Sequence, residues 1–185
     1  MPKGKLLDES NANKNPPPYL KETLLTIAKI ADVLTDIIKE NVVQSPDIET
    51  DRDNYFEYFT CKKPPHISII DYLSRIVKYS RPESGTMTIS LILIDKLTDS
   101  QNILLTKLNI HRIILTSVVI AIKYNEDEYY SNSFYAKVGG ITLKEFNLLE
   151  YQFLTSLGFK LYIDEELYLN YKSHLEENEE LDDKE

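Results

Sequence analysis

Three histidines, one cysteine and a short acidic run are the residues of this chain that could carry catalysis or bind a metal. His66, His111 and His174 lie far apart and lack the spacing of zinc ligands. Cys61 has no neighbouring cysteine and no adjacent base to activate it as a nucleophile. The acidic run at 126–128 lacks the alternating ligands of a calcium loop. We therefore expect no enzymatic activity, no metal and no cofactor.

Four charged residues, by contrast, stand inside runs of apolar residues: Arg75, Asp95, Lys123 and Glu150. Lys123 is the most unusual, because it closes a segment at 110–124 that is apolar on every face, as expected for a core helix. An unpaired buried ammonium is costly, so Lys123 requires a partner. The spacing leaves two alternatives open. The charges can form two internal ion pairs that hold a helical bundle in register, or they can face another protein together.

Helices must position these charges, because helical patterns cover most of the chain between its ends. Apolar residues recur at intervals of three and four from Leu20 to Ile38. The pair Gly139-Gly140 is too isolated for a phosphate-binding loop and is suited to ending a helix. Strands have no clear place in the pattern. Capping residues and apolar spacing predict further helices at 68–79, 82–100, 110–124, 132–138, 142–157 and 164–175.

Composition divides the chain into four parts. Residues 1–18 are polar, end in three prolines and are predicted to be a flexible arm. Residues 19–63 hold the first helix and a connector with an aromatic anchor within 55–59. The main helical domain spans 64–175, and 176–185 is an acidic, solvated tail.

The overall composition limits the cellular setting and the partners. A chain of 185 residues with 42% hydrophobic residues and 5 glycines suits one helical domain. The 21 basic and 30 acidic residues give a net charge of −9, which disfavours nucleic-acid and anionic-membrane partners. One cysteine excludes an intramolecular disulfide and fits a reducing compartment. We expect a soluble intracellular protein of the nucleus or cytoplasm, with no nucleic-acid and no membrane partner.

Motifs at 67–76, 111–124, 127–141 and 147–159 resemble those of the PHO-type cyclins, also called P-type or U-type cyclins. The segment 111–124 resembles the central helix of a cyclin box. The more specific match is DEYYSNSFYAKVGGI at 127–141, which is similar to a signature of this group. The segment 147–159 and the segment 67–76, which follows two prolines, match as well. The resemblance extends over roughly 19–175.

This resemblance implies an all-α fold, namely a single five-helix cyclin box with an extra N-terminal helix and a C-terminal helix. It also implies a regulatory subunit that binds and activates a cyclin-dependent protein kinase by positioning the αC helix and activation loop of that kinase. Protein substrates or inhibitors are further implied partners. The alternative is a non-activating cyclin-box scaffold or a transcription-associated interaction protein.

The resemblance further assigns roles to individual residues. In cyclins, a lysine of the third box helix and a glutamate of the fifth form a paired site for main-chain groups at the start of the kinase αC helix. These positions fall on Lys123 and Glu150. Arg75 and Asp95 match a structural ion pair that joins the first two box helices. Apolar positions that match kinase contacts are Ile120, Tyr124, Leu154 and Phe159. For Ile120 and Leu154, an ordinary core position is the alternative.

Two departures from cell-cycle cyclins stand out. Their substrate-docking patch, Met-Arg-x-Ile-Leu with a nearby tryptophan, is replaced by Ser-Arg-Ile-Val-Lys at 74–78, and the chain has no tryptophan. Docking through that patch is therefore not expected. Only 26 residues follow Phe159, too few for a second helical repeat, so we expect the helix at 20–40 to replace part of its support.

Overall fold

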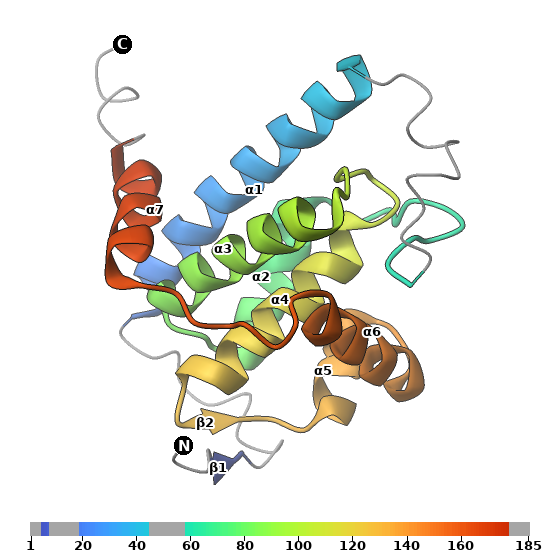
Figure 1. Cartoon of the computed structure of the whole chain (residues 1–185). Coiled ribbons are helices and arrows are strands. Elements are labelled where there is room, and N and C mark those ends of the chain that lie inside the picture. The colour runs from blue at the N-terminus through green and yellow to red at the C-terminus, as the bar shows by residue number, and fades with distance from the viewer. Residues whose placement is uncertain (1–4, 8–18, 45–57, 178–185) are drawn as a thin grey trace.

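The computed structural model describes residues 5–7, 19–44 and 58–177, and within these ranges it holds seven helices and two short strands (Figure 1). This arrangement confirms the predicted all-α class. The helices are α1 (Leu20–Gln44), α2 (Ile69–Ser80), α3 (Ser84–Gln101), α4 (Ile110–Asn125), α5 (Asn132–Gly139), α6 (Leu143–Ser156) and α7 (Glu165–Glu177), and the strands are β1 (Lys5–Leu6) and β2 (Glu128–Tyr129).

Helix α4 lies at the centre of the fold and contacts α2, α3, α5 and α6 (Figure 1). Every residue from Ile113 to Ile122 is buried, which confirms the prediction of a core helix. A helix in this position needs apolar side chains on all faces, because it has a packed neighbour on each side. Lys123 is the first residue of the helix after this run that reaches solvent.

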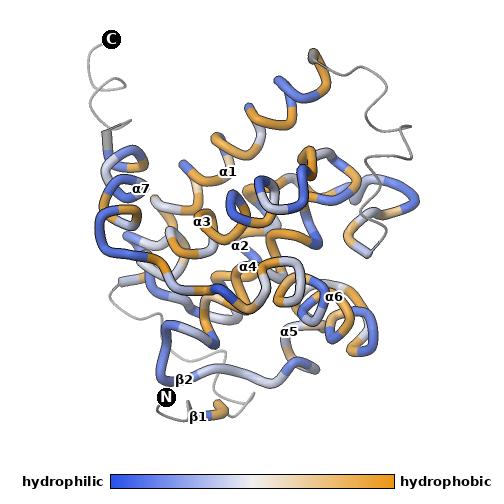
Figure 2. The backbone as a smooth tube through the Cα atoms, in the orientation of Figure 1, coloured by the Kyte–Doolittle hydropathy of each residue, from blue (hydrophilic) through white to orange (hydrophobic). Residues whose placement is uncertain are grey.

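The long helix α1 packs across α2 and α3. Apolar and polar residues alternate along it in Figure 2, and the apolar face includes the buried side chains of Ile27, Ile30, Leu34 and Ile38. Near its start, Thr23 is also buried and donates a hydrogen bond from Oγ1 to the carbonyl of Pro82 at 3.2 Å. The support expected from this helix is thus present in the structure.

Several helices begin and end where the sequence predicted. Ser68 caps α2 by accepting a hydrogen bond from the Asp71 N–H at 3.1 Å. Gly140 ends α5 with a φ of 74°, a left-handed conformation that favours glycine. Gly139 has a different role, because it is still helical and is packed so tightly that a Cβ would overlap the Leu115 side chain.

The short strands were not predicted. Strands β1 and β2 pair in parallel, with hydrogen bonds of 2.6 Å from the Lys5 N–H to Asp127 O and from the Leu7 N–H to Tyr129 O. The prediction of a flexible arm over 1–18 is therefore wrong for residues 5–7, and its other residues lie outside the described ranges. A two-residue strand shows no periodicity, so composition alone could not reveal it. Residues 178–185 of the predicted acidic tail also lie outside the described ranges.

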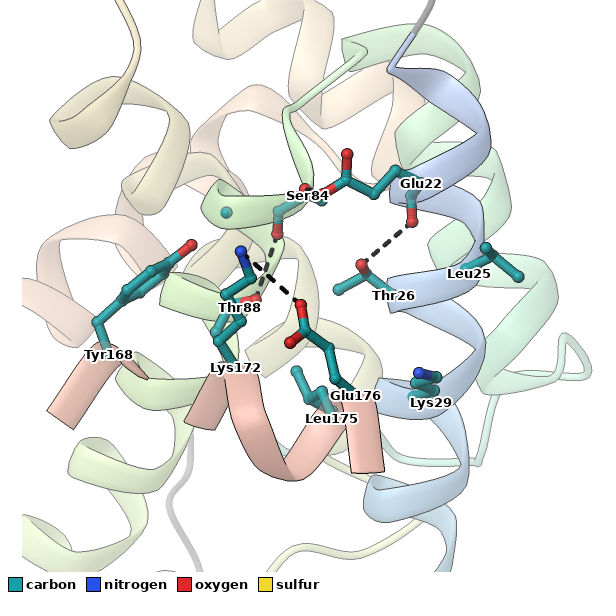
Figure 3. A pocket seen from close by; sticks show the side chains of 11 residues that line it. Glu22, Leu25, Thr26, Lys29, Ser84, Thr88, Tyr168, Lys172, Leu175 and Glu176 are labelled. Atoms are coloured by element: carbon teal, nitrogen blue, oxygen red, sulfur yellow. Dashed lines mark hydrogen bonds and ion pairs between the residues drawn. The ribbon is translucent and has the colours of Figure 1, made fainter. Parts of the chain in front are cut away.

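The last helix, α7, packs against α3 and α1. Lys96 of α3 donates a hydrogen bond to the carbonyl of Tyr162 at 2.7 Å, which fixes the segment that leads into this helix. Between the three helices lies a polar pocket of about 350 Å³, shown in Figure 3. Its charged lining residues are Glu22, Lys29, Lys172 and Glu176. Within the described ranges, no helix has the length and apolar composition needed to cross a membrane.

His111 is buried where α4 meets the segment before α2, and it provides a test of this packing. Its Nε2 donates a hydrogen bond to Ile67 O at 2.8 Å, and burial lowers the pKa of its imidazole. As the pH falls below about 6.5, the unfolded chain binds a proton that the folded chain excludes, so stability falls. One such proton changes the free energy of unfolding by at most about 1.4 kcal/mol per pH unit.

We expect a His111→Gln variant to lose less stability than the wild type between about pH 7.5 and about pH 5.5, as measured by thermal unfolding. The exposed His66 offers a control, because His66→Gln should keep the wild-type pH dependence. An unchanged pH dependence in His111→Gln would contradict the prediction.

Candidate functional site

Lys123 and Glu150 meet in the structure. Lys123 Nζ, in the last turn of α4, lies 2.5 Å from Glu150 Oε1 on α6. The side chains are 27% and 17% exposed, so the ion pair is half-buried and keeps access to solvent. Lys123 has thus found an internal partner without being sealed inside the protein.

A third residue, Asn132, completes this ion pair. Its Oδ1 accepts a hydrogen bond from Lys123 Nζ at 2.5 Å, and its Nδ2 donates to Glu150 Oε2 at 2.9 Å. The same Nδ2 donates to Asn147 Oδ1 at 2.8 Å. Because Asn132 is the first residue of α5, the group joins three helices. We call Lys123, Asn132 and Glu150 the polar triad.

Sequence reasoning missed Asn132 because it searched for charges inside apolar runs. The position of Asn132 directly after a helix-capping serine, Ser131, is the sequence signal that could have revealed it. Ser131 caps α5 by accepting a hydrogen bond from the Phe134 N–H at 3.2 Å. This cap fixes the first turn of α5, and with it the direction of the Asn132 side chain toward α4 and α6.

The triad has hydrogen-bonding capacity left for a partner. An ammonium has three donors, and Lys123 uses two of them within the triad. The carboxylate of Glu150 has about four lone-pair sites and accepts hydrogen bonds from Lys123 and Asn132 at two of them. The group can therefore offer a donor and acceptors to main-chain carbonyl and N–H groups at the same time. The described residues contain no cluster of three or more metal-ligating side chains.

Exposed aromatic side chains lie on or shortly after the two helices that carry Lys123 and Glu150. Tyr124, directly after Lys123, is 42% exposed, and Phe159, after the end of α6, is 62% exposed. Phe159 has a φ of 59°, which is uncommon for a bulky residue, and its N–H donates to Leu154 O at 2.8 Å. Leu154 is half-buried, and Tyr151, which was not predicted, is 58% exposed.

The prediction for Ile120 needs correction. This side chain is only 3% exposed and belongs to the core, because α4 is enclosed by its neighbours at this position. In this structure Ile120 offers no surface to a partner, and the alternative of an ordinary core residue holds.

The predicted structural ion pair between Arg75 and Asp95 is also wrong. The Arg75 guanidinium lies 5.0 Å from the centre of the Tyr72 ring, in a cation–π contact. Asp95 instead accepts a short hydrogen bond from the Tyr171 hydroxyl of α7. Asp95 therefore joins α3 to the C-terminal helix and not to α2.

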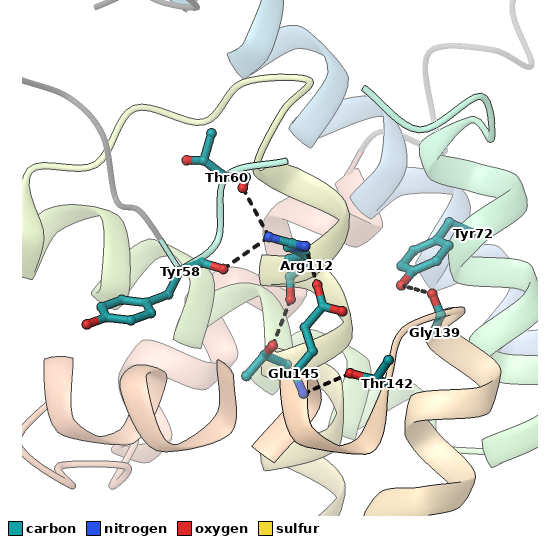
Figure 4. A network of polar contacts seen from close by, with 8 residues as sticks. Tyr58, Thr60, Tyr72, Arg112, Gly139, Thr142 and Glu145 are labelled. Carbon is teal, nitrogen blue, oxygen red and sulfur yellow. Dashed lines mark hydrogen bonds and ion pairs between the residues drawn. The ribbon is translucent and has the colours of Figure 1, made fainter. Parts of the chain in front are cut away.

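A different ion pair, between Arg112 and Glu145, joins two helices and the connector (Figure 4). Arg112 of α4 pairs with Glu145 of α6 through Nη2, while its Nη1 donates to the carbonyls of Tyr58 and Thr60 at 3.2 and 3.0 Å. Between these carbonyls, the Phe59 side chain is fully buried, with its ring centre 6.1 Å from that of Phe153. Phe59 confirms part of the predicted aromatic anchor, whereas positions 55–57 lie outside the described ranges.

The fold is an all-α helical domain in which the polar triad reaches the surface, and comparisons with known proteins identify its family. A family model described as Cyclin matches residues 19–161. Cyclin-U3-1 of Arabidopsis thaliana is 35% identical over 171 residues, which cover 92% of this chain and 73% of the relative. Cyclin-U2-1 of the same plant is 31% identical over 154 residues, which cover 82% of this chain and 69% of the relative.

A P-type relative matches as well. Cyclin-P3-1 of Oryza sativa subsp. japonica is 38% identical over 114 residues, which cover 62% of this chain and 48% of the relative. The chain belongs to the cyclin family and, with P-type and U-type relatives, to its PHO-type group. Cyclins are regulatory subunits, so the chain has a regulatory and not an enzymatic role.

Proposed function

We propose that this cyclin binds a cyclin-dependent kinase through the polar triad and its aromatic neighbours, and that binding activates the kinase. The observation that carries the proposal is the half-buried pair of Lys123 and Glu150, bridged by Asn132 and open to solvent. The donor and acceptor sites that this pair leaves free at the surface can form hydrogen bonds with main-chain groups of a partner.

The proposed contact is with the first turn of the kinase αC helix. The first N–H groups of a helix have no partner within the helix and carry partial positive charge, so the Glu150 carboxylate suits them. Lys123 donates to a main-chain carbonyl beside them. Tyr124 and Phe159 bury apolar surface against the same helix, since both are well exposed in the free chain.

Activation follows from differential binding. An active kinase has its αC helix turned inward, so that the αC glutamate pairs with the strand lysine that holds the ATP phosphates. A cyclin that binds this inward state more tightly than the outward state shifts the population toward it by the ratio of the two affinities. The cyclin supplies no reacting group.

The experiment combines pull-down and phosphotransfer with a panel of purified cyclin-dependent kinases. We expect the Lys123→Ala and Glu150→Ala proteins to lose at least about tenfold in kinase retention and in stimulated activity, because each leaves a partner group unpaired. Lys21→Ala and Glu166→Ala, at exposed positions, are the matched controls and should behave as the wild type.

Two outcomes separate the alternatives. Unchanged retention by a folded Lys123→Ala/Glu150→Ala protein would overturn the proposed site. Retention of a kinase without any rise in phosphotransfer would instead indicate the non-activating scaffold.

A further inference from the structure

A groove of about 490 Å³ lies between the long helix α1 and helix α3, which run side by side in Figure 1. The two helices are parallel, because Thr23 bonds to Pro82 near their starts and Asn41 bonds to Leu105 just past the end of α3. We call this site the α1–α3 groove. Most of its lining is apolar and consists of Val33, Leu34, Ile37, Leu91, Ile94, Ile103, Leu104 and Leu105.

One wall of the α1–α3 groove is the segment 102–105, which is held in place by hydrogen bonds. Asn41 Nδ2 of α1 donates to Leu105 O at 3.1 Å, and Asn109 Nδ2 donates to Leu104 O at 2.9 Å. The Leu104 side chain is nevertheless 37% exposed. The groove is therefore preformed, and a ligand would not have to order it.

The length of the groove matches a helix of about three turns, which is about 16 Å long. On α1, the lining extends from Val33 to Asn41, or about 12 Å along the helix. On α3, the lining residues recur at intervals of three and four over about 16 Å, namely at Leu91, Ile94, Asp95, Thr98, Asp99 and Asn102. Side chains in such rows form ridges against which a third helix can pack.

The rim of the α1–α3 groove is acidic. Among the described residues, its lining includes Asp95 and Asp99 but no basic side chain, and neither aspartate forms an ion pair. Both aspartates are exposed, and the short hydrogen bond from the Tyr171 hydroxyl orients Asp95. The adjacent Lys96 is engaged elsewhere, because its Nζ donates to Tyr162 O at 2.7 Å. The rim therefore selects positive charge.

The charge of the chain itself disfavours its own segments as occupants of this groove. Helix α1 leads into residues 45–57, which carry five acidic residues and one arginine. Helix α7 leads into residues 178–185, which carry five acidic residues and one lysine. A second copy of the chain has the same net charge of −9. Like charges repel, so the groove is suited to a basic partner.

We propose that the α1–α3 groove binds an amphipathic helix of a partner protein, with apolar side chains on one face and lysine or arginine beside them. The lining supplies apolar contacts, the rim selects positive charge, and the length fits about three helical turns. The polar pocket of Figure 3 lacks this selectivity, because its lining includes two glutamates and two lysines. The inference does not depend on kinase binding, because the groove shares no lining residue with the polar triad.

The test uses fluorescence anisotropy with a fluorescein-labelled peptide whose leucines recur at intervals of three and four, with lysines beside them. We expect saturable binding to the wild-type chain and about tenfold weaker binding to Asp99→Lys, because an attractive rim contact becomes repulsive. Glu166→Lys makes the same charge change at an exposed position outside the groove lining, so it should bind the peptide as the wild type does.

Two further measurements test the apolar lining. Leu104→Ser should weaken binding about fivefold, because it removes apolar contact area from the wall. A scrambled peptide of the same composition, whose leucines no longer share one helical face, should show no saturable binding. Equal binding of both peptides, or equal losses in Asp99→Lys and Glu166→Lys, would mean unspecific charge attraction and would overturn the proposal.

The absence of saturable binding to the wild-type chain would also overturn it. If the leucine peptide bound only after the acidic residues of 178–185 were replaced by their amides, the chain's own tail would be the occupant, and the proposal of an external partner would be wrong.

Discussion

A Glu150→Lys variant is expected to lose kinase binding by at least about a hundredfold and to lose about 2 kcal/mol of stability. The substitution brings a second ammonium to Lys123 Nζ, which now lies 2.5 Å from a carboxylate oxygen. It also removes one of the two acceptors of the Asn132 amide, which would keep only Asn147 Oδ1. The stability loss is moderate for a broken ion pair, because both side chains keep some access to solvent.

The charge-swapped variant Lys123→Glu/Glu150→Lys separates the two roles of the pair. It restores an internal ion pair, so we expect thermal unfolding close to that of the wild type. It reverses the donor and acceptor that face the kinase main chain, so binding measured by biolayer interferometry should stay as weak as in Glu150→Lys. The control is the same swap at Lys172 and Glu176, an exposed pair at 3.7 Å whose exchange should change neither quantity.

If the swap restores kinase binding together with stability, the pair acts only on the geometry of the bundle. The swap therefore decides between the two alternatives that the spacing of Lys123 and Glu150 left open, an internal ion pair and a contact with another protein.

The helices could be predicted from the sequence because the signals that mark them, apolar spacing and capping residues, are local. The buried face of α1 repeats with the helical period, and Ser68 and Gly140 act on hydrogen bonds within their own turns. The meeting of Lys123 with Glu150 is different, since 27 positions separate them and only the packing of α4 on α6 joins them. Resemblance to cyclins supplied that pairing, and periodicity could not.

The wrong predictions share a physical cause, which is that local patterns do not report on distant neighbours. Asp95 stands in an apolar run of α3, but its partner Tyr171 comes from α7, 76 positions away. Ile120 matched a contact position in the family, yet burial depends on all the helices that enclose α4. Leu7 belongs to a paired segment only because Tyr129 offers a carbonyl to it.

Replacing Arg112 by methionine is expected to lower the free energy of unfolding by about 3 kcal/mol. Glu145, which is 30% exposed, would lose its charge partner, and the carbonyls of Tyr58 and Thr60 would lose their shared donor. The connector would keep the burial of Phe59 and the hydrogen bond from the Cys61 N–H to Leu108 O at 2.8 Å. Urea unfolding followed by circular dichroism measures the change, with the slope reporting on any loosening of the folded state.

Two further variants show whether the effect comes from the half-buried position of this pair. Lys39→Met removes one partner of an exposed ion pair and should cost less than about 1 kcal/mol. Arg112→Met/Glu145→Met removes both charges, so it should recover part of the loss by leaving no unpaired carboxylate. The assigned role is wrong if Arg112→Met and Lys39→Met have equal effects. An equal loss in the single and double Arg112 variants would mean that the two carbonyl contacts, and not Glu145, account for the stabilisation.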